Sequence, residues 1–180
     1  MDSRFKSQII KNANMKQILL LLVVVFSFSA CEKDDICDAD TPTTPRLIIQ
    51  FYDIAIPTAL KNVNNLKVTA EGEIPLEVFS GESTITLPLK TTDDITKYSL
   101  ILNSTSTTGT DNEDFLQFDY ARQTVYVSRA CGYKTIFNLN SPNGVTKTDA
   151  ATPDGFWIQN IIVQTTAIAN ENETHIKIYF

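Results

Sequence analysis

Apolar side chains recur at every second position through most of the chain after residue 45, and no helical period is sustained there. Successive side chains of a β-strand point to opposite faces, so this alternation predicts half-buried strands. The clearest stretches carry Leu47, Ile49 and Phe51; Leu66, Val68 and Ala70; Ile85, Leu87 and Leu89; Tyr98, Leu100 and Leu102; and Leu116, Phe118 and Tyr120. The pattern predicts an all-β fold.

Turn-forming residues separate these stretches, as in Ser141-Pro142-Asn143-Gly144 and Pro153-Asp154-Gly155. About nine short strands with no helices between them predict an antiparallel β-sandwich of immunoglobulin-like type. A partly open β-barrel is the alternative. Pro88 cannot donate to a strand ladder and therefore predicts an edge strand or a bulge. Residues 156–168 are the longest apolar-rich segment and are predicted to form a central strand covered on both faces.

An apolar run from Ile18 to Phe28 is the right length for the hydrophobic region of a signal peptide. Its eleven residues fall far short of the roughly 20 that a membrane-spanning helix needs. The sequence therefore predicts three parts: a signal peptide at 1–30, a lipidated N-terminus and linker at 31–45, and one β-sandwich domain at 46–180. The true start is either Met1 or Met15.

Cys31 directly follows Ser29 and Ala30, small residues that suit cleavage by a signal peptidase. This order predicts a bacterial lipoprotein acylated on the Cys31 thiol; the alternative is an ordinary secretory peptide with a chance cysteine. Lys33-Asp34-Asp35 resembles the surface-export signal of Bacteroidetes lipoproteins. The expected location is the outer membrane, with the protein lipid-anchored and exposed at the cell surface; a periplasm-facing lipoprotein is the alternative.

Acylation of Cys31 leaves Cys37 and Cys131 as the remaining cysteines. Two cysteines in an exported protein most often pair, so a disulfide is expected between them. Two unpaired, buried thiols are the alternative. A zinc site is disfavoured because two sulfurs and the distant His175 lack tetrahedral ligand spacing.

The charge of the chain excludes some partners. Residues 1–30 hold four of the 15 basic residues and one of the 21 acidic residues, so the remainder carries 11 against 20, a net charge of −9. This balance repels phosphate backbones and anionic headgroups. We therefore expect no nucleic-acid partner and no basic face for membrane docking, and attachment to the membrane through the N-terminal lipid.

Several motifs distributed over the mature chain carry a family resemblance. They are Cys31 to Cys37, Thr43 to Leu47, Phe51-Tyr52-Asp53, Leu87 to Lys90, Asp94 to Tyr98, Ser128 to Lys134, and Pro153 to Ile158. Together they resemble a family of flavobacterial lipoproteins known as a domain of unknown function. The resemblance implies a Bacteroidetes source and makes Cys37 and Cys131 part of a family pattern, but it implies no activity, substrate or cofactor.

The sequence offers no catalytic residues, metal ligands or cofactor site that we would name. His175 is the one histidine, and it is expected to face solvent beside Lys177 and Tyr179 on the polar face of the last strand. Glycine-Ser-glycine nucleophile, zinc-protease and phosphate-loop motifs are absent. Residues 111–114 are expected to form a solvated hairpin loop, with a calcium site as the alternative.

Three residues are candidates for facing a ligand. Tyr126 alternates with Val125 and Val127 and is expected to be exposed. Trp157, together with Tyr120, Tyr126 or Tyr133, is a candidate platform for a sugar. Trp157 opens an apolar strand, however, and is more typical of a core residue. Arg129 could bind an anion, and its alternative is pairing with a carboxylate or capping carbonyl groups at a strand end.

These observations favour a non-enzymatic, membrane-tethered module that binds an envelope protein or a glycan, or that helps assemble the envelope. A glycan-processing hydrolase or its accessory subunit is the alternative. A structural subunit of a larger envelope complex is a third hypothesis.

Overall fold

The computed structural model describes residues 36–180, without the side chains of residues 75–77. Cys31, the predicted signal peptide and the export motif lie outside this range. Eleven strands are present in the described part: β1 (Leu47–Tyr52), β2 (Leu66–Ala70), β3 (Pro75–Phe79), β4 (Thr84–Leu87), β5 (Ile95–Leu102), β6 (Asn112–Ser128), β7 (Gly132–Leu139), β8 (Val145–Asp149), β9 (Asn160–Val163), β10 (Ala167–Ile168) and β11 (Ile176–Tyr179). Residues 36–180 contain no helix able to cross a membrane.

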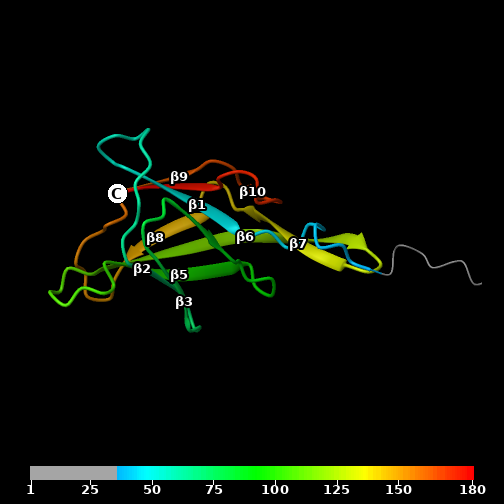
Figure 1. Cartoon of the computed structure of the whole chain (residues 1–180), viewed down its shortest axis with the longest axis horizontal. Helices are drawn as coiled ribbons and strands as arrows, with labels where there is room; N and C mark the ends of the chain where they lie inside the picture. Colours follow the sequence, from blue (N-terminus) through cyan, green and yellow to red (C-terminus); the bar gives the residue numbers. More distant parts are fainter. Residues whose placement is uncertain (1–35) are drawn as a thin grey trace, which may run out of the picture. The chain divides into compact units, whose positions relative to one another are not determined.

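The strands form two sheets, and neither closes into a barrel. The four-stranded sheet has the order β4-β1-β11-β9, and the seven-stranded sheet has the order β10-β7-β6-β5-β2-β3 with β8 also paired to β6. Figure 1 shows β1 and β9 in one layer and β2, β3 and β5 in the other. The predicted β-sandwich is therefore confirmed. One pair departs from the antiparallel pattern, because β1 runs parallel to β11, with Ile49 opposite Ile176.

The core lies between the inner faces of the two sheets, where the alternating apolar residues predicted it. Leu47, Ile49 and Phe51 of β1 are fully buried, as are Leu116 and Phe118 of β6. Burial of apolar surface on this scale is the main stabilising contribution to such a domain. The period-2 pattern therefore identified the inward faces correctly.

β6 is 17 residues long and pairs with three other strands of the larger sheet, β5, β7 and β8. Its first half, Asn112 to Asp119, pairs with β5, and residues Asp114 to Phe118 pair on the other edge with β8. Beyond Tyr120 the strand continues beside β7. β7 and β8 thus share one edge of β6, and the chain between them is held there by two hydrogen bonds of 2.9 Å, Asp119 N–H to Gly144 O and Asn140 N–H to Asp119 O.

The structure confirms one prediction about a strand and contradicts another. β4 ends at Leu87, just before Pro88, and is an edge strand as predicted. The predicted central strand at 156–168 is wrong, because this segment forms two short edge strands, β9 (Asn160–Val163) in the four-stranded sheet and β10 (Ala167–Ile168) in the seven-stranded sheet. Ile162 and Val163 of β9 are 38% and 39% exposed. The apolar composition of residues 156–168 does not specify which strands lie beside them. β9 has a neighbouring strand, β11, on one side only.

Residues 36–180 divide into two compact units. One comprises residues 40–127 and 133–180, and the other comprises residues 36–39 and 128–132 within the described part. The second unit contains the disulfide between Cys37 and Cys131, whose Cα atoms are 5.0 Å apart. The predicted disulfide is therefore confirmed.

Candidate functional sites

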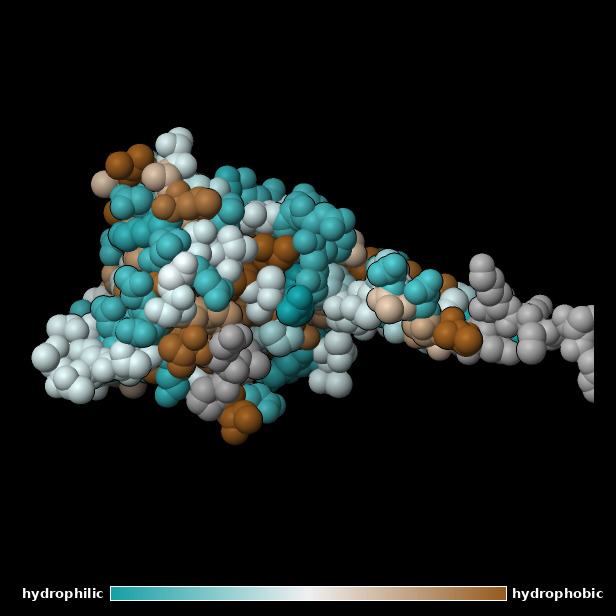
Figure 2. Space-filling view, viewed as in Figure 1, coloured by the Kyte–Doolittle hydropathy of each residue, from teal (hydrophilic) through white to brown (hydrophobic). Residues whose placement is uncertain are grey.

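The loop between β1 and β2 presents three aliphatic side chains to solvent. Ile54, Ile56 and Leu60 are 45%, 59% and 52% exposed. In Figure 2, hydrophobic atoms gather at the upper left, where Figure 1 places this loop. A group of exposed aliphatic side chains is typical of a surface that contacts another molecule, whereas a single exposed aliphatic side chain is common on any protein surface. We call residues 53–61 the β1–β2 loop.

Hydrogen bonds fix the path of this loop. One carboxylate oxygen of Asp53, Oδ1, accepts from the backbone N–H of Ala55 at 2.7 Å and of Ile56 at 3.1 Å. These two bonds hold the pKa of Asp53 below its usual value. The base of the loop is closed by Asp53 N–H to Ala59 O at 3.0 Å and Ala59 N–H to Ile56 O at 2.8 Å. The aliphatic side chains therefore stand on an ordered backbone.

The same loop is fastened to the last residue of the described chain. The carbonyl oxygen of Phe180 accepts from the backbone N–H of Ile54 at 3.1 Å and from the ammonium group of Lys61 at 2.7 Å. Lys61 Nζ also lies 4.3 Å from the centroid of the Phe180 ring. That ring packs edge-on against Trp157, with centroids 5.4 Å apart. The loop is thus anchored in the aromatic part of the core.

Tyr126 is 59% exposed on β6, and its neighbour Tyr133 on β7 is 69% exposed. Their ring centroids are 5.3 Å apart and their planes meet at 67°. The pair therefore forms an exposed aromatic corner instead of two coplanar rings. Tyr133 is one of the rings that the sequence offers for an aromatic platform, although exposure was expected for Tyr126 alone.

Of the other two candidates for ligand contact, Trp157 lies apart from this pair in the sequence and Arg129 lies between its two members. Trp157 is 8% exposed and belongs to the core, and its indole N–H donates to Leu100 O at 3.1 Å. Its ring is therefore not available to a ligand. Arg129 is exposed and lies in the unit formed by residues 36–39 and 128–132.

A buried acid lies at the start of β6. Asp114 is 0% exposed, and its Oδ2 accepts from the backbone N–H of Ile158 at 2.8 Å. Its other oxygen, Oδ1, has no hydrogen-bond partner within the described residues. Burial raises the pKa of Asp114 to about 6, because desolvation of the carboxylate outweighs that hydrogen bond and the attraction of Lys147.

The solvated loop predicted at 111–114 is therefore wrong in part. Asn112, Glu113 and Asp114 are the first three residues of β6. Asp114 faces inward, on the same side of the strand as Leu116 and Phe118. The alternation of the strand, followed back two residues from Leu116, contained this signal, but the polar composition of the segment favoured a loop. In residues 36–180 no group of three or more His, Cys, Asp or Glu side chains could hold a metal ion.

Neighbouring charges fasten the segment before β9 over Asp114. The ammonium group of Lys147 donates to Ile158 O and lies 3.9 Å from the centroid of the Phe156 ring. Asp149 Oδ2 accepts from Gly155 N–H at 3.3 Å, and Asn112 Nδ2 donates to Gly155 O at 2.6 Å. The polar groups here bind main-chain groups and close the end of the sandwich.

His175 is buried, and its predicted exposure is wrong. It is 0% exposed, and its Nδ1 accepts from the backbone N–H of Ile48 at 2.9 Å. The backbone of His175 donates in turn to Ile48 O at 3.1 Å. Burial lowers the pKa of this imidazole. His175 precedes β11, so the alternation that places Ile176 and Ile178 inward does not decide its own orientation.

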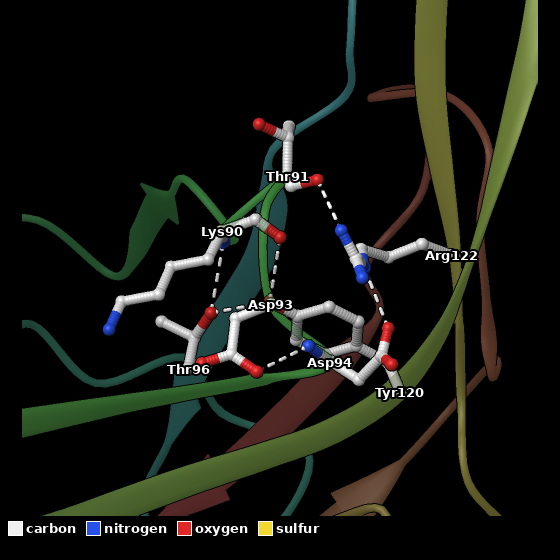
Figure 3. A network of polar contacts seen from close by, with 7 residues as sticks. All are labelled: Lys90, Thr91, Asp93, Asp94, Thr96, Tyr120 and Arg122. Atoms are coloured by element: carbon white, nitrogen blue, oxygen red, sulfur yellow. Dashed lines mark hydrogen bonds and ion pairs between the residues drawn. The ribbon is translucent and has the colours of Figure 1, made fainter.

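A ring of three hydrogen bonds joins the loop after β4 to β5 and β6 (Figure 3). Lys90 N–H donates to Thr96 Oγ1 at 2.9 Å, the Thr96 and Tyr120 hydroxyl oxygens are 2.6 Å apart, and the Tyr120 hydroxyl donates to Lys90 O at 2.9 Å. Because Tyr120 gives its proton to Lys90 O, Thr96 must donate to Tyr120. Both hydroxyls are thus occupied in holding the main chain of Lys90.

An ion pair extends this network toward solvent. Arg122 Nε donates to Asp94 Oδ1 at 2.6 Å, and the same guanidinium donates to Thr91 O. Asp93 Oδ1 accepts from Asp94 N–H at 2.7 Å, which shapes the turn (Figure 3). Sequence reasoning missed this network because its partners come from three separate segments, and it stabilises the loop from Lys90 to Asp94.

Comparison with known proteins gives one match. Neither the search of the curated proteins nor the search of the solved structures found a match to the chain. The scan against family models found the "Family of unknown function (DUF6452)", which matches residues 65–180. The match covers the sandwich from the start of β2 onward, including Asp114, the hairpin of β6 and β7, and His175. The chain belongs to this family of unknown function, DUF6452.

Proposed function

We propose that the chain is a lipid-anchored protein of the bacterial outer membrane that faces the cell exterior and binds another envelope protein through its β1–β2 loop. It is a non-enzymatic binding or assembly module. The acyl chains on Cys31 attach it to the bilayer, and the sandwich presents the loop.

The sequence supports the anchor. A short apolar run, two small residues and Cys31 occur in the order that lipoprotein processing requires. Lys33, Asp34 and Asp35 follow and resemble the surface-export signal of Bacteroidetes lipoproteins. An N-terminal lipid would hold the domain at the membrane without a spanning helix.

The observation that carries the binding role is the order of the β1–β2 loop. Ile54, Ile56 and Leu60 are exposed on a backbone held by Asp53 and Phe180. Ordering of a flexible loop usually opposes binding, and this cost is small when the loop is already fixed. Aliphatic side chains on a fixed loop suit a partner protein with an apolar groove better than a polar glycan.

The burial and the hydrogen bonds of the polar side chains in the core favour a binding role over hydrolysis. Asp114 has the raised pKa that a general acid needs, but a general acid must touch its substrate, and Asp114 is 0% exposed beneath Ile158. Thr96, Tyr120 and His175 are likewise engaged with main-chain groups.

A site-specific crosslinking experiment in native membranes tests the proposal. A photo-reactive residue replaces Ile56 in the full-length, processed protein, and the matched control carries it at Ile74, which is 82% exposed in the turn between β2 and β3. We expect one discrete crosslinked partner from position 56 and none from position 74. Ile56→Asp with Leu60→Asp should then abolish co-purification of that partner while the circular dichroism spectrum is kept.

Two results would count against the proposal. Mass spectrometry that finds Cys31 without diacylglycerol would remove the anchor. Equal crosslinking from positions 56 and 74, or a partner retained by the Ile56→Asp, Leu60→Asp variant, would remove the loop as the binding surface.

A further inference from the structure

We propose that the turn end of the hairpin formed by β6 and β7 is a second membrane contact, at which Tyr126 and Tyr133 enter the headgroup layer of the bilayer that holds the lipid on Cys31. This inference rests on the proposed acylation of Cys31. It adds a defined membrane-facing element to a domain otherwise attached through its N-terminal lipid.

The covalent path from the lipid to the hairpin is short. Cys37 is six residues after Cys31, a reach of at most about 20 Å for a fully extended chain. The disulfide then joins Cys37 to Cys131, and Tyr133 is two residues further, a reach of at most about 7 Å. The first strand begins at Leu47, sixteen residues from Cys31, and would otherwise allow a separation of about 55 Å. The disulfide therefore makes the hairpin turn the first part of the fold after the lipid.

The chain that follows Cys37 does not run freely from the lipid to the core. Thr44 Oγ1 accepts from the backbone N–H of Thr135 on β7 at 3.0 Å. The linker is thus fixed to the hairpin at this point. Only the residues between Cys31 and Cys37 remain as a spacer between the disulfide and the bilayer.

The exposed chemistry of the hairpin suits the headgroup layer. Tyrosine has an apolar ring and a polar hydroxyl, and it is enriched where membrane meets water. Tyr126 and Tyr133 are 59% and 69% exposed and lie against each other. Two such rings at the end of a hairpin leave aromatic surface in water that a headgroup layer would cover.

The charge of the hairpin points the same way. Residues 121–136 contain Arg122, Arg129 and Lys134 and no acidic residue, whereas the chain after residue 30 carries a net charge of −9. Arg122 is paired with Asp94, Arg129 lies in the turn, and Lys134 directly follows Tyr133. Lipid phosphates attract this segment, and the acidic remainder of the domain is repelled from the same surface.

Quenching of tryptophan fluorescence by brominated lipids tests the contact. The chain has one tryptophan, Trp157, which is buried. Tyr133→Trp adds a reporter at the hairpin, and the matched control Phe156→Trp adds one at a side chain that is 41% exposed. The control lies near the other end of β6, because Gly155 O is bonded to Asn112, fourteen residues or about 47 Å along the strand from Tyr126.

The full-length lipidated proteins are reconstituted in phosphatidylcholine vesicles whose acyl chains carry bromine close to the headgroups. We expect the bromine to remove at least about half of the added emission in Tyr133→Trp, since an interfacial ring would lie a few Å from the quencher. The emission of the wild type and of Phe156→Trp should be unchanged. Combining Tyr133→Trp with Cys37→Ser and Cys131→Ser should relieve the quenching while the protein still floats with the vesicles.

The outcomes separate this inference from the proposed function. If the lipidated protein floats with the vesicles but Tyr133→Trp is quenched no more than Phe156→Trp, the hairpin contact is wrong and the anchor stands. If the protein does not float and carries no lipid on Cys31, the proposed anchor is wrong and the inference falls with it. Quenching that persists without the disulfide would overturn the role given to the Cys37–Cys131 bond.

Discussion

Asp114 and Ile158 are joined by a hydrogen bond of 2.8 Å between a fully buried carboxylate oxygen and a backbone N–H 44 residues away in sequence. The bond ties the start of β6 to the segment that leads into β9. The second oxygen of Asp114 has no hydrogen-bond partner within the described residues, and the pKa is raised to about 6. The folded protein therefore binds a proton here more tightly than the unfolded chain does.

This difference predicts an unusual pH dependence of stability. Between the ordinary aspartate pKa of about 4 and the folded pKa of about 6, the folded state holds the proton and the unfolded state does not. The contribution of Asp114 is therefore fully present near pH 4 and is lost as the pH rises through 6. Relative to Asp114→Asn, the wild type should lose about 2 kcal/mol of unfolding free energy between pH 4 and pH 7.

Urea denaturation at a series of pH values measures this difference. Asp111→Asn, at an exposed position three residues earlier, is the matched control and should follow the wild type. A difference between wild type and Asp114→Asn that stays constant from pH 4 to pH 7 would show that Asp114 binds a proton no more tightly in the folded state than in the unfolded state.

His175 predicts the opposite dependence. Burial lowers its pKa below the usual 6.5, so the unfolded state binds the proton more readily. The stability that a neutral His175 provides is present above that value and is lost as the pH falls. His175→Asn retains an acceptor for Ile48 N–H and should remove this loss of stability between pH 7 and pH 5. His175→Leu should cost about 1–3 kcal/mol at pH 7, because it leaves a buried N–H without a partner.

Thermal unfolding of the three proteins at several pH values provides the measurement. Equal slopes against pH for the wild type and His175→Asn would mean that the imidazole binds its proton as readily in the folded state as in the unfolded state. Equal stability of His175→Asn and His175→Leu at pH 7 would mean that the bond to Ile48 contributes nothing.

The sequence predicts which faces of the strands are buried, but not which strands are neighbours in a sheet. Alternation is a local property of a strand, so it identified the inward faces of β1, β2, β5 and β6. It could not identify which strands are neighbours, and for that reason β9 was wrongly expected to be central. The exposed loop of Ile54, Ile56 and Leu60 was missed because its order depends on Phe180, far away in the sequence.

The hydrogen-bonded ring of Lys90, Thr96 and Tyr120 predicts energetic coupling between the two hydroxyl side chains. Tyr120→Phe and Thr96→Val should each cost about 1–2 kcal/mol, because each leaves a partly buried main-chain group of Lys90 without its hydrogen-bond partner. The double variant should cost less than the sum of the two, since the bond between the hydroxyls is lost in both single variants. Urea denaturation of the four proteins gives the coupling free energy, and strict additivity would mean that the ring does not act as a unit.

Gly144 marks a close approach of the chain to itself in the segment between β7 and β8. A Cβ atom at this position would lie 2.8 Å from the backbone nitrogen of Asn140 and closer still to its carbonyl oxygen. Both atoms belong to the backbone that pairs with Asp119, so they cannot move aside without breaking the hydrogen bond from Asn140 N–H to Asp119 O. Gly144→Ala should therefore destabilise the fold by about 2–3 kcal/mol. The control is Gly109→Ala, where no atom lies within 4 Å of the added Cβ and the cost is the strain of a φ of +71°, about 1 kcal/mol. Thermal denaturation compares the two variants, and a Gly144→Ala protein as stable as Gly109→Ala would show that the segment from Asn140 to Gly144 can shift away from β6.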